Sequence, residues 1–156
     1  GRRRSEDGRR VDRAGAGVTV IAWDGKALAA DRRAVNCGLA RTVCKIERVK
    51  GALVGMSGDH GVAAEMLKWF TSGGEFPAKA RDDIATLMVV AHIGVCLYTT
   101  GPEPMRVLDS HMAIGSGRDY ALMAMHLGKT AKEAVELACL FEINCGNGVD
   151  VLEFGS

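Results

Sequence analysis

Apolar runs alternate with turn residues over the first third of the chain. The runs Val18–Trp23 and Ala27–Ala30 flank the tripeptide Asp24-Gly25-Lys26. An Asp-Gly pair between two apolar runs is the strongest short-range signal for a β-hairpin. Because a hairpin brings the start of its first strand close to the end of its second, the pattern predicts that Thr19 and Asp31 are neighbours in the fold.

The later segments predict more strands and then helices. Apolar residues at helical spacing follow Asp59, which has the character of an N-cap, and Gly73-Gly74 would end that helix. Thr130 and Glu133 form the signature of a capping box for a helix that runs to about Phe141. The remaining predicted strands are Thr42–Val49, Ala52–Met56, "ATLMVVA", "GVCLYTT", "MAI" and "VDVLEF". Strands segregated from helices in this way predict an α+β fold of antiparallel sheets covered by helices.

Composition favours one globular domain and excludes several functional classes. The chain has 156 residues, of which 47% are hydrophobic and 25% charged, with a formal net charge of +1. That length can bury a substantial core. The near-neutral charge gives no electrostatic reason to expect nucleic acid or a membrane surface as a partner. No apolar run approaches the roughly 18 residues of a transmembrane helix.

The cysteines and histidines indicate neither a disulfide framework nor a metal site. The five cysteines form no C-x-x-C pair, and the four histidines lack ligand spacing. We therefore expect reduced thiols, a cytoplasmic location and no metal or other cofactor. A phosphate-binding interpretation of Gly128–Thr130 as the end of a P-loop fails, because Met123 stands where the first glycine of that motif is required.

The first 17 residues differ from the rest of the chain. The segment "GRRRSEDGRRVDRAGAG" has six arginines, three acidic residues and one large apolar residue, Val11. Such a composition cannot support a core. We expect residues 1–17 to be a disordered basic leader, either non-native or propeptide-like, in front of a single domain at 18–156.

Four motifs occur in order between Thr19 and about Phe154: "TVIAWDGKALAADRRA", "TVCKI", "ALVGMSGD" and "MAIGSGRDYALMAM". Together they resemble the proteasome β-type family. They are similar to the bacterial HslV peptidase, and closer still to short proteasome-like proteins of bacteria and their phages. The resemblance implies the four-layer αββα sandwich of N-terminal nucleophile hydrolases, in agreement with the α+β fold expected from the strand and helix pattern.

The resemblance also implies roles for individual residues. Thr19 matches the nucleophile, and the remaining matches are Asp31, Lys45, the oxyanion-binding N–H of Gly58, Ser116, and an acidic–Ser pair at Glu142 and Cys145, where this chain has Glu and Cys instead of Asp and Ser. Taken alone, Thr19 could be an ordinary strand residue, and Ser116 a turn residue. Lys45 is the clearest internal clue, because it interrupts an otherwise strand-like apolar segment.

The chemistry of a threonine nucleophile explains why those residue types occur together. A hydroxyl attacks poorly unless a base removes its proton. The α-amine of an N-terminal Thr19 can be that base, because α-amino groups have a pKa of about 7.7–8.0. A cationic Lys45 would favour the ionised hydroxyl, and Asp31 would hold that cation in place.

The implied function is a threonine-type peptidase that cleaves peptides or unfolded proteins in a homo-oligomeric chamber, with an ATP-dependent unfoldase as a further partner. The alternative is a catalytically inactive structural or assembly subunit in which Thr19 stays blocked. Val18 precedes Thr19 where family precursors have Gly. We expect Val18 to be the true initiator, written as Val because its codon is GTG, so that trimming exposes Thr19.

The resemblance is incomplete in one interval. Between about Phe70 and Ala85 the family has a second long helix, whereas this chain has only "TSGGEFPAKARDDI". Because the ring contacts of the family involve this helical layer, we expect an oligomer, but the family's stack of two closed rings does not follow for this chain.

Overall fold

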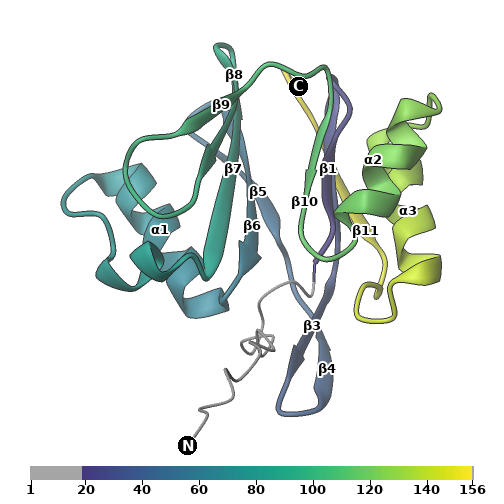
Figure 1. Cartoon of the computed structure of the whole chain (residues 1–156), viewed down its shortest axis with the longest axis horizontal. Coiled ribbons are helices and arrows are strands. Elements are labelled where there is room, and N and C mark those ends of the chain that lie inside the picture. Colours follow the sequence, from purple (N-terminus) through teal and green to yellow (C-terminus); the bar gives the residue numbers. More distant parts are fainter. Residues whose placement is uncertain (1–18, 156) are drawn as a thin grey trace, which may run out of the picture.

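The structure is a computed structural model that describes residues 19–155. The predicted leader at 1–17 and Val18 lie outside the described residues, as does Ser156. Two antiparallel sheets face each other, and helices cover the outer face of each sheet (Figure 1). The predicted four-layer αββα sandwich is thereby confirmed.

The first sheet has the strand order β10-β1-β2-β11, and helices α2 and α3 lie against it. Its central hairpin is the predicted one, because Ile21 pairs with Ala30 and Trp23 with Leu28 across the Asp-Gly turn. The elements of this half are β1 (Ile21–Trp23), β2 (Ala27–Asp31), β10 (Met112–Ile114), β11 (Val149–Glu153), α2 (Arg118–His126) and α3 (Ala131–Phe141).

The second sheet is a meander whose strands follow the order β5-β6-β7-β8-β9, and α1 covers it. The sequence pattern does not predict β9, a three-residue strand at the edge of this sheet. The elements of this half are β5 (Ile46–Val49), β6 (Ala52–Gly58), α1 (His60–Ser72), β7 (Ala85–Ala91), β8 (Gly94–Tyr98) and β9 (Met105–Val107).

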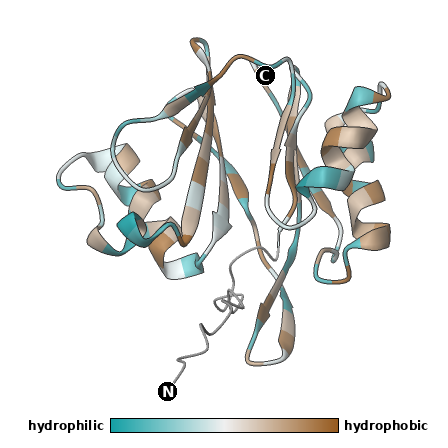
Figure 2. Ribbon diagram, in the orientation of Figure 1, coloured by the Kyte–Doolittle hydropathy of each residue, from teal (hydrophilic) through white to brown (hydrophobic). Residues whose placement is uncertain are grey.

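Three buried clusters hold the four layers together. One lies between α2–α3 and the first sheet, one lies between the two sheets, and one lies between the second sheet and α1. The middle cluster includes Ile21, Leu28 and Leu53, each at most 1% exposed. Hydrophobic residues accordingly follow the strands of both sheets in Figure 2. Burial of this apolar surface is the main favourable contribution to folding.

The expected helix ends are present. The Asp59 side chain accepts a hydrogen bond from the Val62 N–H at the start of α1, and Gly73 follows the last turn. Thr130 and Glu133 form the predicted capping box of α3. Each cap satisfies N–H groups that have no partner within the helix. The capping residues therefore predict correctly where α1 and α3 begin.

The predicted strand Thr42–Val49 is correct in its second half, where Ile46–Val49 pairs with β6 as expected, and wrong in its first half. Thr42 ends a separate hairpin, residues 43–45 belong to no strand, and β5 begins only at Ile46. That hairpin comprises β3 (Arg33–Asn36) and β4 (Leu39–Thr42), and it projects from the body in Figure 1. It was missed because its residues are mostly exposed and lack an apolar face, although Cys37 and Gly38 have the positive φ angles of a tight turn.

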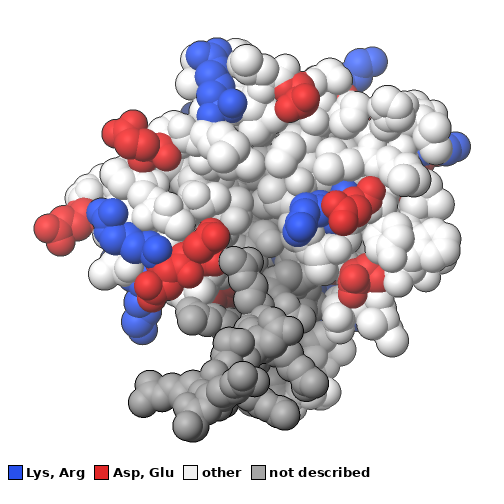
Figure 3. Space-filling view, in the orientation of Figure 1, with Lys and Arg blue, Asp and Glu red and all other residues white. Residues whose placement is uncertain are grey.

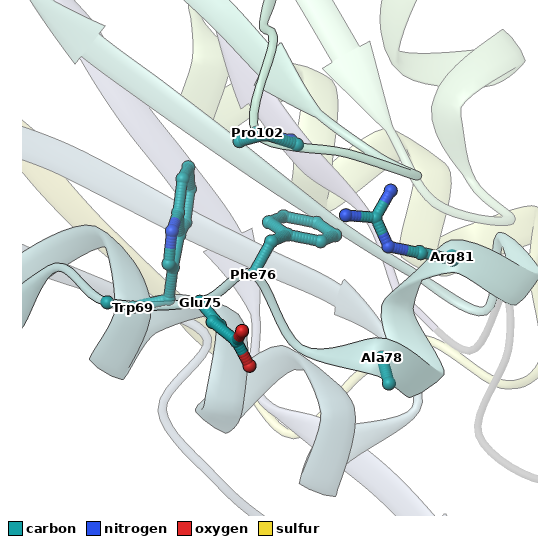
Figure 4. Close-up of a pocket in the computed structure, with 7 residues that line it drawn as sticks. Trp69, Glu75, Phe76, Ala78, Arg81 and Pro102 are labelled. Atoms are coloured by element: carbon teal, nitrogen blue, oxygen red, sulfur yellow. The ribbon is translucent and has the colours of Figure 1, made fainter.

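The interval after α1 contains a short 3₁₀ helix, η1 (Ala78–Asp82), in place of a second long helix, as the sequence predicts. A pocket lies on this side of the molecule, with Trp69, Phe76, Arg81 and Pro102 among its lining residues (Figure 4). Arg81 lies over the Phe76 ring, 5.6 Å from its centre. None of the candidate catalytic residues lines this pocket.

Positive and negative charges are mixed on the surface. Lysine, arginine and acidic side chains are interspersed on the face drawn in Figure 3. Among the helices of the described residues, none is long and apolar enough to cross a membrane.

Candidate active site

The β1–β2 hairpin brings Asp31 to the start of β1. The Asp31 N–H donates to the Val20 carbonyl over 3.1 Å, and the Val20 N–H donates to Asp31 Oδ1 over 3.1 Å. Thr19 directly precedes Val20, which forms these two hydrogen bonds with Asp31, and Thr19 is only 4% exposed. Thr19 and Asp31 are therefore close together in the fold, as the hairpin pattern predicts.

Asp31 and Lys45 form a buried ion pair. The Lys45 Nζ lies 2.8 Å from Asp31 Oδ1, and the two side chains are 7% and 0% exposed. Removing two charges from water is costly, and only close pairing with further hydrogen bonds offsets that cost. Asp31 has those bonds: the backbone N–H groups of Arg33 and Gly146 donate to its Oδ2 over 3.2 and 3.1 Å.

Ser116 contacts the backbone of Thr19 directly. The Thr19 N–H donates to Ser116 Oγ over 3.3 Å, and Ser116 Oγ lies within donating distance, 3.4 Å, of the Thr19 carbonyl. The Gly117 N–H donates to that same carbonyl over 3.1 Å. The Gly-Ser-Gly turn between β10 and α2 thus holds both backbone polar groups of the candidate nucleophile.

The turn needs glycine at its first position. Gly115 has a φ of +95°, and a Cβ there would lie 2.1 Å from the carbonyl oxygen of Thr19. Any side chain would push the turn away from Thr19. The motif "GSG", which carries little information by itself in the sequence, is explained by this close approach of two backbones.

Cys145 lies next to Ser116, with its Sγ 3.9 Å from Ser116 Oγ. Burial, followed by the nearby Asp31 charge, raises the pKa of the Cys145 thiol to about 12. Burial likewise raises the pKa of Cys139 to about 11. At neutral pH the Cys145 thiol stays protonated, so it is a weak neutral hydrogen-bonding partner of Ser116 and not a nucleophile.

Gly58 ends β6 and pairs with Ala85 of β7. Its φ is +95°, and a Cβ there would lie 2.3 Å from the Ile84 carbonyl oxygen and 2.7 Å from Ala85 Cα. The position therefore accepts only glycine. Its role as an oxyanion donor stays a prediction.

Within the described part of the chain, Glu142 contacts the other candidates through its backbone alone: its carbonyl accepts a hydrogen bond from the Cys145 N–H over 3.0 Å. It follows α3 directly, and among the described residues its carboxylate accepts hydrogen bonds from the Asn144 backbone and side chain only. The two hydrogen bonds from Asn144 hold this carboxylate at the end of α3. Of the expected acidic–Cys pair, only Cys145 lies beside Ser116.

Two residues near the site, Arg33 and Asn147, are not indicated by any sequence motif. The Arg33 side chain donates to the Ile143 carbonyl and to Asn147 Oδ1. The Arg32-Arg33 pair after Asp31 is typical of a solvated turn, and nothing local indicates contacts with residues more than 100 positions away.

No group of three or more His, Cys, Asp or Glu side chains within residues 19–155 is arranged to hold a metal ion.

Comparison with known proteins gives a consistent result for the fold. No protein-family profile and no curated protein matches the sequence. Among solved structures, Thiobacillus denitrificans BPH in complex with epoxomicin is 21% identical, with a TM-score of 0.68 over 88% of this chain and 100% of that one. A second structure of that BPH is 20% identical, with a TM-score of 0.66 over 88% of this chain and 98% of that one.

The eukaryotic HslV of Trypanosoma brucei is 17% identical, with a TM-score of 0.65 over 86% of this chain and 97% of that one. At these identities the likeness concerns the fold. It defines the class to which the architecture corresponds, the HslV- and proteasome-like sandwich. The resemblance expected from the four sequence motifs is thereby confirmed at the level of fold.

Cys145 should be almost inert toward alkylating reagents. We expect iodoacetamide at pH 8 to modify the exposed Cys37 at least about 100 times faster than Cys145, because burial excludes the reagent and suppresses the thiolate. Peptide mass spectrometry after timed quenching measures both rates, and unfolding in urea should abolish the difference. Equal rates in the folded protein would contradict the buried, protonated thiol described above.

Proposed function

We propose that this protein is a threonine-type peptidase whose nucleophile is Thr19 as the N-terminal residue. The observation that carries the proposal is the buried Asp31–Lys45 ion pair, bonded to the backbone of the residue next to Thr19. A structural ion pair in the core is often no more stabilising than well-packed apolar residues. A buried lysine near a candidate nucleophile can stabilise an ionised hydroxyl, which apolar residues cannot do.

The Thr19 nitrogen is the proposed base. In any form that retains Val18 this nitrogen is a peptide amide and cannot accept a proton. As a free α-amine it has a lone pair, and the Ser116 hydroxyl that now contacts the nitrogen can hold the protonated form or relay its proton. The lysine charge favours the ionised hydroxyl of Thr19.

The bond changes balance without any further reactant except water. Thr19 Oγ attacks the scissile carbonyl carbon, and its proton passes to the α-amine. The resulting oxyanion accepts a hydrogen bond from the Gly58 N–H, a donor of a type worth about 3 kcal/mol in comparable sites. The C–N bond then breaks, and the leaving amine takes the proton from the α-ammonium. Water hydrolyses the ester and restores Thr19.

The substrate class proposed is peptides or unfolded proteins, acted on in the cytoplasm by a homo-oligomer, with an ATP-dependent unfoldase as a further partner. The support for assembly is an exposed apolar surface on the α2–α3 layer. It includes a stacked aromatic pair, Tyr120 and Phe141, and the neighbouring side chains Met123, Leu127 and Leu140, which are 68–75% exposed. Apolar patches of this kind mark surfaces that other proteins cover.

A chain that begins at Thr19 should be acylated by a β-lactone. We would express it with an initiator Met directly before Thr19, whose removal frees the amine, and verify the product by intact mass. The mass should then increase by one equivalent of reagent, carried by the Thr19 peptide. Because general-base catalysis typically contributes 10²–10⁴-fold, the 156-residue form should react at least about 100-fold more slowly.

Thr19→Ala in the same short chain is the matched control and should abolish labelling. Equal reaction of the short and full-length chains would exclude the amine as the base. A short chain that is folded but unreactive would favour the alternative function, an inactive assembly subunit.

Replacement of Lys45 separates a catalytic role from a structural one. Lys45→Met keeps the volume of the aliphatic stem and removes the charge. Asp31 retains three backbone N–H donors, from Val20, Arg33 and Gly146, so we expect the fold to persist while acylation falls by orders of magnitude. Asp31→Asn should cost less activity, because it only loosens the cation. Melting temperature and acylation rate are measured on one sample.

The double variant Lys45→Met with Asp31→Asn keeps this test decisive. If Lys45→Met alone unfolds, at a cost of roughly 3–5 kcal/mol, the double variant removes the uncompensated charge and should restore the fold. A folded variant without Lys45 that still acylates at the original rate would remove the lysine from the mechanism.

A further inference from the structure

Arg33, on strand β3, reaches across to the segment that follows α3. Its Nη1 donates to the Ile143 carbonyl over 2.9 Å, and its Nε donates to Asn147 Oδ1 over 3.1 Å. Between these contacts its guanidinium lies against the backbone of Gly146, where a Cβ would be 3.1 Å from Cζ. One side chain thus spans residues 143–147.

Asn147 ties the same segment to strand β4. Its Nδ2 lies 3.2 Å from the Arg41 carbonyl and 3.1 Å from Thr42 Oγ1, while its Oδ1 accepts from Arg33. The residue has a φ of +63°, a left-handed conformation that asparagine adopts more readily than most residues. The β3–β4 hairpin therefore holds segment 143–147 through both the oxygen and the nitrogen of the Asn147 side chain.

That segment carries two groups of the candidate site. The Gly146 N–H donates to Asp31 Oδ2 over 3.1 Å, on the carboxylate that also binds Lys45. The Cys145 thiol contacts the Ser116 hydroxyl, which in turn contacts the Thr19 nitrogen. Any movement of residues 143–147 changes the surroundings of both Asp31 and Ser116.

We infer that Arg33 and Asn147 form a clamp that positions the Gly146 amide and the Cys145 thiol for reaction at Thr19. Neither residue touches the reacting atoms, so both are positioning residues, and the inference rests on the proposed peptidase function. The hydrogen bonds of the clamp are exposed to solvent and contribute little to global stability. Their effect is on geometry, to which catalysis is sensitive at the scale of about 0.5–1 Å.

The clamp is tested in the chain that begins at Thr19, with β-lactone as the probe. Arg33→Met removes both guanidinium contacts, and Asn147→Gly removes the carboxamide while allowing the positive φ. Arg41→Met is the matched control: it is an arginine of the same hairpin whose guanidinium forms no hydrogen bond or ion pair with the described residues, and it contributes only its carbonyl.

Each clamp variant should lower the maximal acylation rate about tenfold or more, with less than a twofold change in the reagent concentration for half-maximal rate. The two losses should not add in the double variant, because both substitutions release the same segment. The melting temperature should fall by no more than about 4 °C, and Arg41→Met should behave as the parent. Unchanged rates in both clamp variants would overturn the inference.

Amide hydrogen exchange of Gly146, measured by NMR, gives a readout that does not depend on activity. Its exchange rate should rise at least about tenfold in either clamp variant relative to Arg41→Met, with the Ile21 amide in the core unchanged. Unchanged exchange overturns the clamp. If exchange is faster in the clamp variants but the parent chain is never acylated, the result would support the clamp as a structural device and contradict the proposed peptidase function instead.

Discussion

An aspartate with no exposed surface needs its charge matched from several directions, and at Asp31 four segments of the chain meet that need. They are the start of β1, the first residues after β2, the residue before β5 and the loop after α3, which supply Val20, Arg33, Lys45 and Gly146. Because leaving a buried charge without its partners costs several kcal/mol, these segments are fixed relative to one another. The position of Thr19 follows from that constraint, since it directly precedes Val20.

The Gly-Ser-Gly turn approaches the same point from the other side of β1. Gly115 permits contact with the Thr19 backbone that any side chain would prevent, and Ser116 then lies against the Thr19 nitrogen. The surroundings of Thr19 therefore combine a charged side, at Asp31 and Lys45, with a neutral hydrogen-bonding side, at Ser116 and Cys145. A free amine at Thr19 would lie between the two, which is the arrangement that proton transfer from a hydroxyl requires.

Local signals predicted most of the fold. The Asp-Gly turn, the Asp59 cap and the Thr130–Glu133 box each depend on residues within a few positions of one another, and each is present. The β3–β4 hairpin was missed because it lacks an apolar face, and its stability depends on contacts with residues far along the chain.

The site was predicted unevenly for the same reason. Asp31 follows from the hairpin, and Lys45 from a charge inside an apolar segment. Arg33 and Asn147 are 114 positions apart, and no local pattern pairs them. Glu142 matched a motif, but its carboxylate accepts hydrogen bonds from Asn144 in the next loop, which the motif does not indicate. Long-range polar contacts of this kind require the folded chain.

The central claim is that Thr19 acts as a chain end. The most direct test is the intact mass and N-terminal peptide of the protein purified from the cells that naturally produce it. The account predicts a chain that begins at Thr19, with neither Val18 nor the residues before it. A mature chain that retains Val18 would leave the Thr19 nitrogen in a peptide bond and would contradict the account.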